Sequence, residues 1–170
     1  TIVIAIIGRL SPTKGHTFFI KAISKVVRSL GNIKAWIIGD ASKGKEKYKE
    51  QLMLLVMRLG LSGYVEFLGA RTDVSELLPK IDILVMPSVI QEAFGRVLIE
   101  AAASGVPIIA TKVGGVTDII KHSKNGILVD PEDEDAIKDA ILRLLDNPGF
   151  SQSIASNARR DVEARFGLDK

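Results

Sequence analysis

The chain has 170 residues, 46% hydrophobic and 25% charged, which excludes a disordered chain and provides one domain with a buried core. Lysine and arginine number 23 against 20 acidic residues, and a net charge of +3 is too small to indicate a nucleic-acid-binding protein. Without cysteine there are no disulfides or cysteine-ligated metals, and no apolar run reaches the ~18 residues of a membrane span. The opening TIVIAIIG has no basic n-region and therefore predicts a strand. Because it opens abruptly and without Met, we expect a part of a longer protein.

Short apolar runs rich in β-branched residues alternate with longer amphipathic stretches along the chain. In the first such stretch Phe19, Ile23 and Val26 recur at three- and four-residue steps, which places them on one helix face. In chain order the expected strands are 2–7, 33–39, 64–69, 83–87, 106–111 and 126–130. The expected helices are 16–31, 46–59, 73–80, 93–105, 115–120, 132–147 and about 151–165.

Strands that read as continuous Val/Ile/Leu runs are buried on both faces, which is typical of a parallel sheet covered by helices. The sequence therefore predicts one doubly wound α/β domain over residues 1–170, with a mostly parallel sheet of about six strands and helices on both faces. In such sheets the ligand lies beyond the carboxyl ends of the strands, so the loops that follow the strands are the candidate site.

The loop after the first strand, 8–15, places Arg9 and Lys14 five residues apart, with Gly8 and Gly15 at its ends and a helix start next. Glycine lets backbone approach a ligand, and the two cations would neutralise a diphosphate. The alternative is a solvated turn that carries two surface charges.

The loop after the second strand, 39–46, follows the phosphate-loop pattern G-x-x-x-x-G-K-[ST] up to its last position. That position should hold a Mg²⁺-binding hydroxyl and here holds Glu46. This departure weakens the alternative of a nucleoside triphosphatase.

Two acids flank the start of the helix after the fourth strand. Glu92 lies in the loop and Glu100 inside the helix, which begins near Phe94 or Gly95. Eight helical residues span ~12 Å, which is long for two acids that share one proton and suits two carboxylates binding separate sets of hydroxyls. The alternative for Glu92 is an acid favoured by the helix dipole. Glu100, among apolar residues, needs a partner if it is buried.

Other features have mainly structural interpretations. Asp133-Glu134-Asp135 contains a D-x-D pattern, but it opens a helix, where acids are stabilised by the dipole. His16 and His122 have no nearby acid or second histidine in the sequence, which gives little support to a metal site or a triad. Gly114-Gly115 and Asn125-Gly126 read as turns.

Taken together, the motifs resemble one known family. The chain is similar to the C-terminal, donor-binding domain of retaining glycosyltransferases with the GT-B fold, specifically family 4, or group 1. The motifs that carry the resemblance are GRLSPTKG, IIGD, VEFLG, ILVMPS, EAFGRVLIE, ASGVPIIAT, GGVTDII and NGILVDPED. They cover nearly the whole chain. Any single motif is weak evidence, but E-x7-E after a PS strand end, with GRLxxxKG upstream, is highly specific.

The resemblance implies roles for particular residues. Arg9 and Lys14 would bind the donor diphosphate and stabilise its charge as the sugar leaves. Glu92 would bind the donor sugar hydroxyls and Glu100 the ribose hydroxyls. The remaining expected donor contacts are Gly8, Phe94, Gly95, Arg96 and Val97 around phosphate and sugar, and Arg71 near the nucleobase.

The resemblance also implies a UDP-, GDP- or ADP-sugar donor, hexosyl transfer with retention of configuration, and no bound metal or other cofactor. The family's N-terminal acceptor domain is absent from this chain, so we expect weak donor binding and little or no transfer by it alone. We expect a cytoplasmic protein, without direct membrane insertion by this part, whose peripheral membrane association would come from the missing domain. The family commonly has GGxPE where residues 114–118 read GGVTD, which puts a role for Asp118 in doubt. The alternatives are a GT-B-fold epimerase or phosphorylase, or a nucleotide-binding regulatory module.

Overall fold

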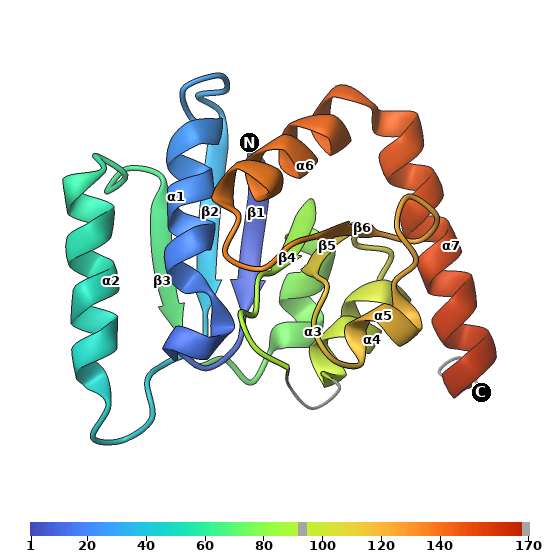
Figure 1. Ribbon diagram of the computed structural model, residues 1–170, viewed down its shortest axis with the longest axis horizontal. Helices are drawn as coiled ribbons and strands as arrows, with labels where there is room; N and C mark the ends of the chain where they lie inside the picture. Colours follow the sequence, from blue (N-terminus) through green and yellow to red (C-terminus); the bar gives the residue numbers. More distant parts are fainter. Residues whose placement is uncertain (92–94, 168–170) are drawn as a thin grey trace.

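The computed structural model describes residues 1–91 and 95–167. Within these residues six strands form one sheet in the order β3-β2-β1-β4-β5-β6, and every neighbouring pair is parallel (Figure 1). The strands are β1 (Ile2–Ile7), β2 (Ile33–Ile38), β3 (Val65–Gly69), β4 (Ile83–Met86), β5 (Ile108–Thr111) and β6 (Ile127–Val129). The expected doubly wound sheet is confirmed, and it is wholly parallel.

The helices follow the strands as the alternating pattern predicts. They are α1 (His16–Val26), α2 (Glu46–Arg58), α3 (Val74–Leu77), α4 (Arg96–Ala103), α5 (Val116–Ile119), α6 (Glu134–Asp146) and α7 (Pro148–Phe166), with 3-10 turns η1 (Pro12–Lys14) and η2 (Leu78–Lys80). No helix in the described part of the chain combines the length and apolar character that a membrane span requires.

Several helix ends differ from the sequence-based prediction, among them the end of α1 and the start of α7. Helix α1 ends at Val26, short of residue 31, where the Ser29 N–H donates to the Val26 carbonyl in a tighter i→i−3 turn. Helix α7 begins at Pro148, earlier than residue 151. Proline favours the first helical position because its missing N–H has no partner there in any case.

Alternating side chains of the strands build two apolar layers. In β1, Ile4 and Ile6 join the core under α1, α2 and α6, whereas Ala5 joins the core under α3, α4 and α5. This alternation follows from the two-residue period of a strand. Helix α7 contributes to both layers, with Ile154 in the first and Val162 in the second.

The strand order places a topological switch point at β1. The chain runs outward from β1 through β2 to β3, and then returns to the other side of β1 with β4. In open α/β sheets ligands bind in the crevice that opens at the carboxyl ends of the strands at such a point.

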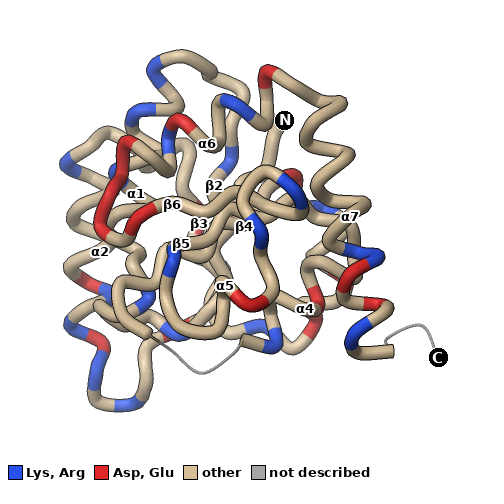
Figure 2. The backbone as a smooth tube through the Cα atoms, turned by 45° about the vertical axis from the view of Figure 1, so that its right-hand side comes forward, with Lys and Arg blue, Asp and Glu red and all other residues tan. Residues whose placement is uncertain are grey.

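Lys and Arg are interspersed with Asp and Glu along the described backbone (Figure 2).

Candidate functional site

A pocket opens at this switch point, at the carboxyl ends of β1 and β4. It is lined by Ile6, Ile7, Gly8, Lys14, Met86, Pro87, Ser88, Gly95, Val97, Thr111, Val113 and Val116. These residues come from the strand ends and the loops that follow them, where the sequence predicts the site. The pocket therefore joins the β1–α1 loop to the start of α4 and to the segment after β5.

The β1–α1 loop is fixed against the segment after β4 by two contacts. Gly15 adopts φ 79°, and a Cβ there would stand only 1.9 Å from the Pro87 carbonyl oxygen. The backbone N–H of Val89 donates to the Thr13 carbonyl at 2.9 Å. Only glycine permits this approach, and it holds the loop that carries Lys14 beside β4.

A second glycine joins the same loop to β2. Gly39 has φ 132°, and a Cβ there would stand 1.9 Å from the Gly8 carbonyl oxygen. Gly8 N–H donates to the Ile38 carbonyl at 2.9 Å, and Leu10 N–H donates to the Asp40 carbonyl at 3.1 Å. The ends of β1 and β2 are thus held together around Gly8.

Thr111 supports the β4 side of the pocket. Its side chain is buried, and its hydroxyl donates to the Ser88 carbonyl at 2.7 Å, with the Met86 carbonyl at 3.3 Å. Sequence reasoning assigned no role to Thr111. The available signal was a hydroxyl at the carboxyl end of an otherwise apolar strand, next to the expected site.

Four of the residues expected at the site line this pocket: Gly8, Lys14, Gly95 and Val97. The Lys14 stem lies over the end of β1, because a Cβ on Gly8 would be 3.7 Å from Lys14 Cδ. The pocket therefore combines one cation with two glycine backbones.

Arg9 lies outside this pocket, on an exposed part of the same loop. It lines a neighbouring hollow together with Gly8, Asp40 and Arg71. It also lines a second hollow between η1 and α2. Arg9 and Lys14 thus face different hollows, which meet at Gly8.

Arg71 is held in place by Asp73. Its Nε donates to Asp73 Oδ1 at 2.9 Å and its Nη2 to Oδ2 at 2.7 Å, a bidentate arrangement. The hydrogen bonds from the guanidinium lower the pKa of Asp73 below its usual value. This pair fixes the guanidinium plane in the hollow that Arg71 shares with Arg9.

The second acid of the E-x7-E spacing stands on α4, one helical turn after Arg96. Arg96 Nε lies 3.6 Å from Glu100 Oε1, and the Glu100 side chain is 43% exposed. Glu100 therefore has a partner without being buried, and neither residue lines the pocket. Glu92 and Phe94, the other expected contacts, lie outside the described residues.

In the loop 39–46, which resembles a phosphate loop, a backbone N–H donates to the side chain of Glu46. The Glu46 carboxylate accepts a hydrogen bond from the Gly44 backbone N–H at 3.1 Å, through Oε1. A phosphate loop would offer such an amide to its ligand. The acid thus occupies a donor that a phosphate would need.

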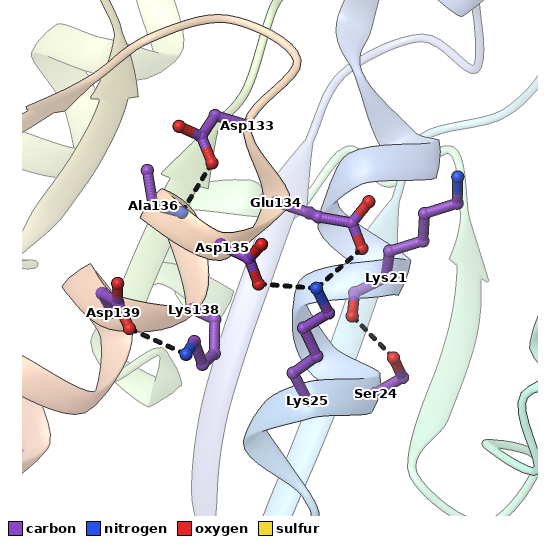
Figure 3. Close-up of polar contacts among 9 residues, drawn as sticks. All are labelled: Lys21, Ser24, Lys25, Asp133, Glu134, Asp135, Ala136, Lys138 and Asp139. Carbon is purple, nitrogen blue, oxygen red and sulfur yellow. Dashed lines mark hydrogen bonds and ion pairs between the residues drawn. The ribbon is translucent and has the colours of Figure 1, made fainter.

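The D-x-D segment opens α6 and caps its start. Asp133 caps α6 by accepting from the Ala136 N–H at 2.9 Å (Figure 3). Lys25 of α1 bridges Glu134 at 3.4 Å and Asp135 at 2.5 Å, which joins α6 to α1. In residues 1–91 and 95–167, no group of three or more His, Asp or Glu side chains is placed to hold a metal ion.

His16 is a buried polar side chain directly behind the pocket loop. It is fully buried at the start of α1, and neither ring nitrogen has a hydrogen-bond partner of normal geometry in the described structure. Burial, together with the charge of Lys14, lowers its pKa to about 4, and the nearby Ser11 backbone offsets this only in part. The neutral ring packs edge-on against Tyr48, with ring centroids 6.3 Å apart.

The strand order and the pocket at the β1/β4 switch point define a Rossmann-like α/β domain. Residues 1–161 match the glycosyl transferases group 1 family, and the chain belongs to that family.

Curated relatives extend well beyond this chain. It is 36% identical over 168 residues to an uncharacterized glycosyltransferase, MJ1607, of Methanocaldococcus jannaschii, a match that covers 98% of this chain and 41% of that protein. It is 33% identical to N-acetyl-alpha-D-glucosaminyl L-malate synthase of Bacillus anthracis, over 89% of this chain and 38% of that protein. The chain therefore spans about two fifths of the length of these relatives.

Solved structures share the fold closely. The crystal structure of Anabaena Alr3699/HepE in complex with UDP superposes with a TM-score of 0.93 at 33% identity, covering 98% of this chain and 45% of that chain. The same protein has been solved with UDP-glucose. The C-terminal domain of a group 1 glycosyl transferase (LpcC) from Francisella tularensis superposes with a TM-score of 0.88 at 32% identity, covering 97% of this chain and 86% of that domain.

Proposed function

We propose that this chain is the donor-binding domain of a retaining, family 4 glycosyltransferase that moves a hexosyl group from a nucleoside-diphosphate sugar to an acceptor. The observation that carries the proposal is the pocket at the β1/β4 switch point, where Lys14 meets the backbones of Gly8 and Gly95. Group 1 membership and the UDP complexes of a protein with the same fold support it. An N-terminal domain elsewhere in the protein would bind the acceptor and complete the cleft.

In this proposal the donor diphosphate lies over Gly8, between the two cations of the β1–α1 loop. Lys14 reaches it from the pocket and Arg9 from the neighbouring hollow. As the bond between sugar and phosphate breaks, negative charge builds on the leaving diphosphate. Positive groups already held in place stabilise that charge more than they stabilise the ground state, and so accelerate the step.

The other expected residues surround the rest of the donor. Arg71, fixed by Asp73, would lie near the base, and Glu100 would accept hydrogen bonds from the ribose hydroxyls. Glu92 would bind the sugar hydroxyls. The segment Phe94–Val97 would contribute contacts to phosphate and sugar. For Glu100 to do this, its pairing with Arg96 must give way to the ribose.

We assign the neutralisation of the diphosphate to Arg9 and Lys14 and propose that no metal ion or other cofactor takes part. Binding of UDP should then be unchanged by EDTA and by added Mg²⁺. A tenfold loss of affinity on chelation would contradict this assignment.

We expect the whole protein to work in the cytoplasm.

Titration of UDP, GDP and ADP into the 170-residue chain tests the donor site. A hydrogen bond to a charged group is worth roughly 1.5–3 kcal/mol, so Lys14→Gln should weaken nucleotide binding by about 10- to 150-fold. The matched control is Lys34→Gln, at the amino-terminal end of β2, where the lysine pairs with Glu66 and the Gly63 carbonyl. No saturable binding at millimolar nucleotide, or equal affinities for the two variants, would contradict the proposal.

The whole protein is needed to test transfer. A donor screen scored by nucleoside diphosphate release identifies base and sugar together, and NMR of the product reads its anomeric configuration. Retention of the donor configuration is expected. Inversion would contradict the family 4 assignment while leaving the donor site in place.

A further inference from the structure

Three polar side chains stand at four-residue steps along α7: Asn157, Asp161 and Arg165. We call them the α7 ladder. All three bind the segment that runs from α5 to the turn before β6, which passes beside α7 (Figure 1). A four-residue step keeps side chains on one face of a helix, so the ladder forms a single polar edge.

Each residue of the α7 ladder makes a hydrogen bond with this segment. Asn157 Nδ2 donates to the Lys124 carbonyl at 2.7 Å, and Arg165 Nη1 donates to the Asp118 carbonyl at 2.8 Å. Between them, Asp161 Oδ2 accepts from Asn125 Nδ2 at 2.8 Å. Arg165 thus contacts α5, and Asp161 contacts the turn that follows α5.

Asn125 connects Asp161 to α5. Its side chain is 3% exposed, and its Nδ2 also donates to the Ile119 carbonyl at 2.9 Å. Its Oδ1 accepts from the Lys121 N–H at 2.7 Å. The final carbonyls of α5, at Asp118 and Ile119, therefore bind Arg165 directly and Asp161 through Asn125.

Helix α5 needs this support because it has only four residues. A single turn fixes several dihedral angles for very few hydrogen bonds and is not stable alone. Its own backbone bonds include Ile120 N–H to the Val116 carbonyl at 2.8 Å and Val116 N–H to the Val113 carbonyl at 3.3 Å. Both Val113 and Val116 line the pocket at the switch point.

We infer that Asp161 and Arg165 are positioning residues for the donor pocket. They hold the carboxyl end of α5, and α5 in turn holds Val113 and Val116 as a wall of the pocket. This inference rests on the proposed function, because it assigns the pocket to the nucleotide. Nucleotide affinity would then depend on α7 side chains that do not line the pocket themselves.

The test compares UDP affinity of the 170-residue chain with that of Asp161→Ala and Arg165→Ala, at a temperature where all are folded. Substitutions that act through an intervening element change binding by about three- to thirtyfold, and a loss in this range is expected for both. Asp161→Asn keeps an acceptor oxygen for Asn125 and should restore most of the affinity. The matched control is Arg159→Ala, on the same helix, whose 3.0 Å pair with Glu163 lies within α7.

A second readout separates positioning from a general loss of stability. In Asp161→Ala the amide NMR signals of Val113 and Val116 should shift, and amide exchange at Ile120 should accelerate, before any nucleotide is added. Arg159→Ala should leave these signals in place. Unmoved signals in Asp161→Ala, or a loss of affinity equal to that of the control, overturn the inference.

The two proposals fail in different ways. If the unsubstituted chain binds no nucleotide, the proposed function falls and this inference with it. If that chain binds UDP and the two α7 variants bind it equally well, only the positioning role is overturned.

Discussion

Gly15 lies so close to Pro87 that a Cβ at position 15 would stand 1.9 Å from the Pro87 carbonyl oxygen. The two residues come from opposite sides of the switch point, one before α1 and the other just after β4. Their close approach joins the β1–α1 loop to the segment after β4. It also places Lys14, the residue before Gly15, on the pocket.

Gly15→Ala should therefore destabilise the fold through both backbone strain and steric overlap. A non-glycine residue in the left-handed region costs about 1 kcal/mol, and overlap with Pro87 should bring the total to at least about 3 kcal/mol. Gly60→Ala is the matched control, because Gly60 has φ 70° but nothing within 4 Å of a built Cβ. Urea unfolding of the two variants measures the difference. Equal losses would contradict the close contact.

The sequence predicts the fold well because hydrophobic patterning determines it. The predicted strand 2–7 has the same bounds as β1. Gly60 follows α2, at a position where glycine commonly ends a helix. Boundaries set by tertiary contacts were less accurate. Nothing in the pattern 27–31 shows that the Ser29 N–H turns back to the Val26 carbonyl, so the end of α1 was predicted too late.

The candidate site was predicted in part. Lys14, Gly8 and Gly95 follow strands that the sequence already shows, and parallel packing brings those strand ends together. The direction of the Arg9 side chain depends on neighbouring loops, and the pattern did not show that it faces a different hollow. The link between Asn125 and Asp161 joins residues 36 positions apart, and one sequence carries no signal of such a pairing.

Glu100→Ala should weaken UDP binding by about tenfold, because a charged acceptor for the ribose hydroxyls is lost. The same variant should bind 2′,3′-dideoxy-UDP as well as the unsubstituted chain does, since that nucleotide has no hydroxyls to offer. Calorimetric titration with both nucleotides measures the effect. A matching loss for the two nucleotides would assign Glu100 a structural role, through its contact with Arg96.

Asp133→Ala should destabilise the chain by about 1 kcal/mol, because the Ala136 N–H at the start of α6 loses its acceptor. Asp133→Asn keeps a capping oxygen and should lose little. Asp139→Ala, in the same helix, removes the exposed pair with Lys138 and should change stability by less than about 0.5 kcal/mol. Thermal or urea unfolding of the three variants compares them. A loss in Asp139→Ala as large as that in Asp133→Ala would contradict the cap.

His16 should make the stability of the chain depend on pH between about 4 and 6.5. Its pKa falls from 6.5 to about 4 on folding, so between these values the unfolded chain binds a proton that the folded chain does not. Stability then rises with pH across this window, is fully present above 6.5 and is lost as the pH falls towards 4. Between pH 7 and pH 5 the free energy of unfolding should decrease by about 2 kcal/mol from this group. His16→Leu should remove most of that decrease in urea unfolding at the two pH values. An NMR titration of the His16 ring with a midpoint near 6.5 would show instead that the ring is solvated, and would contradict this account.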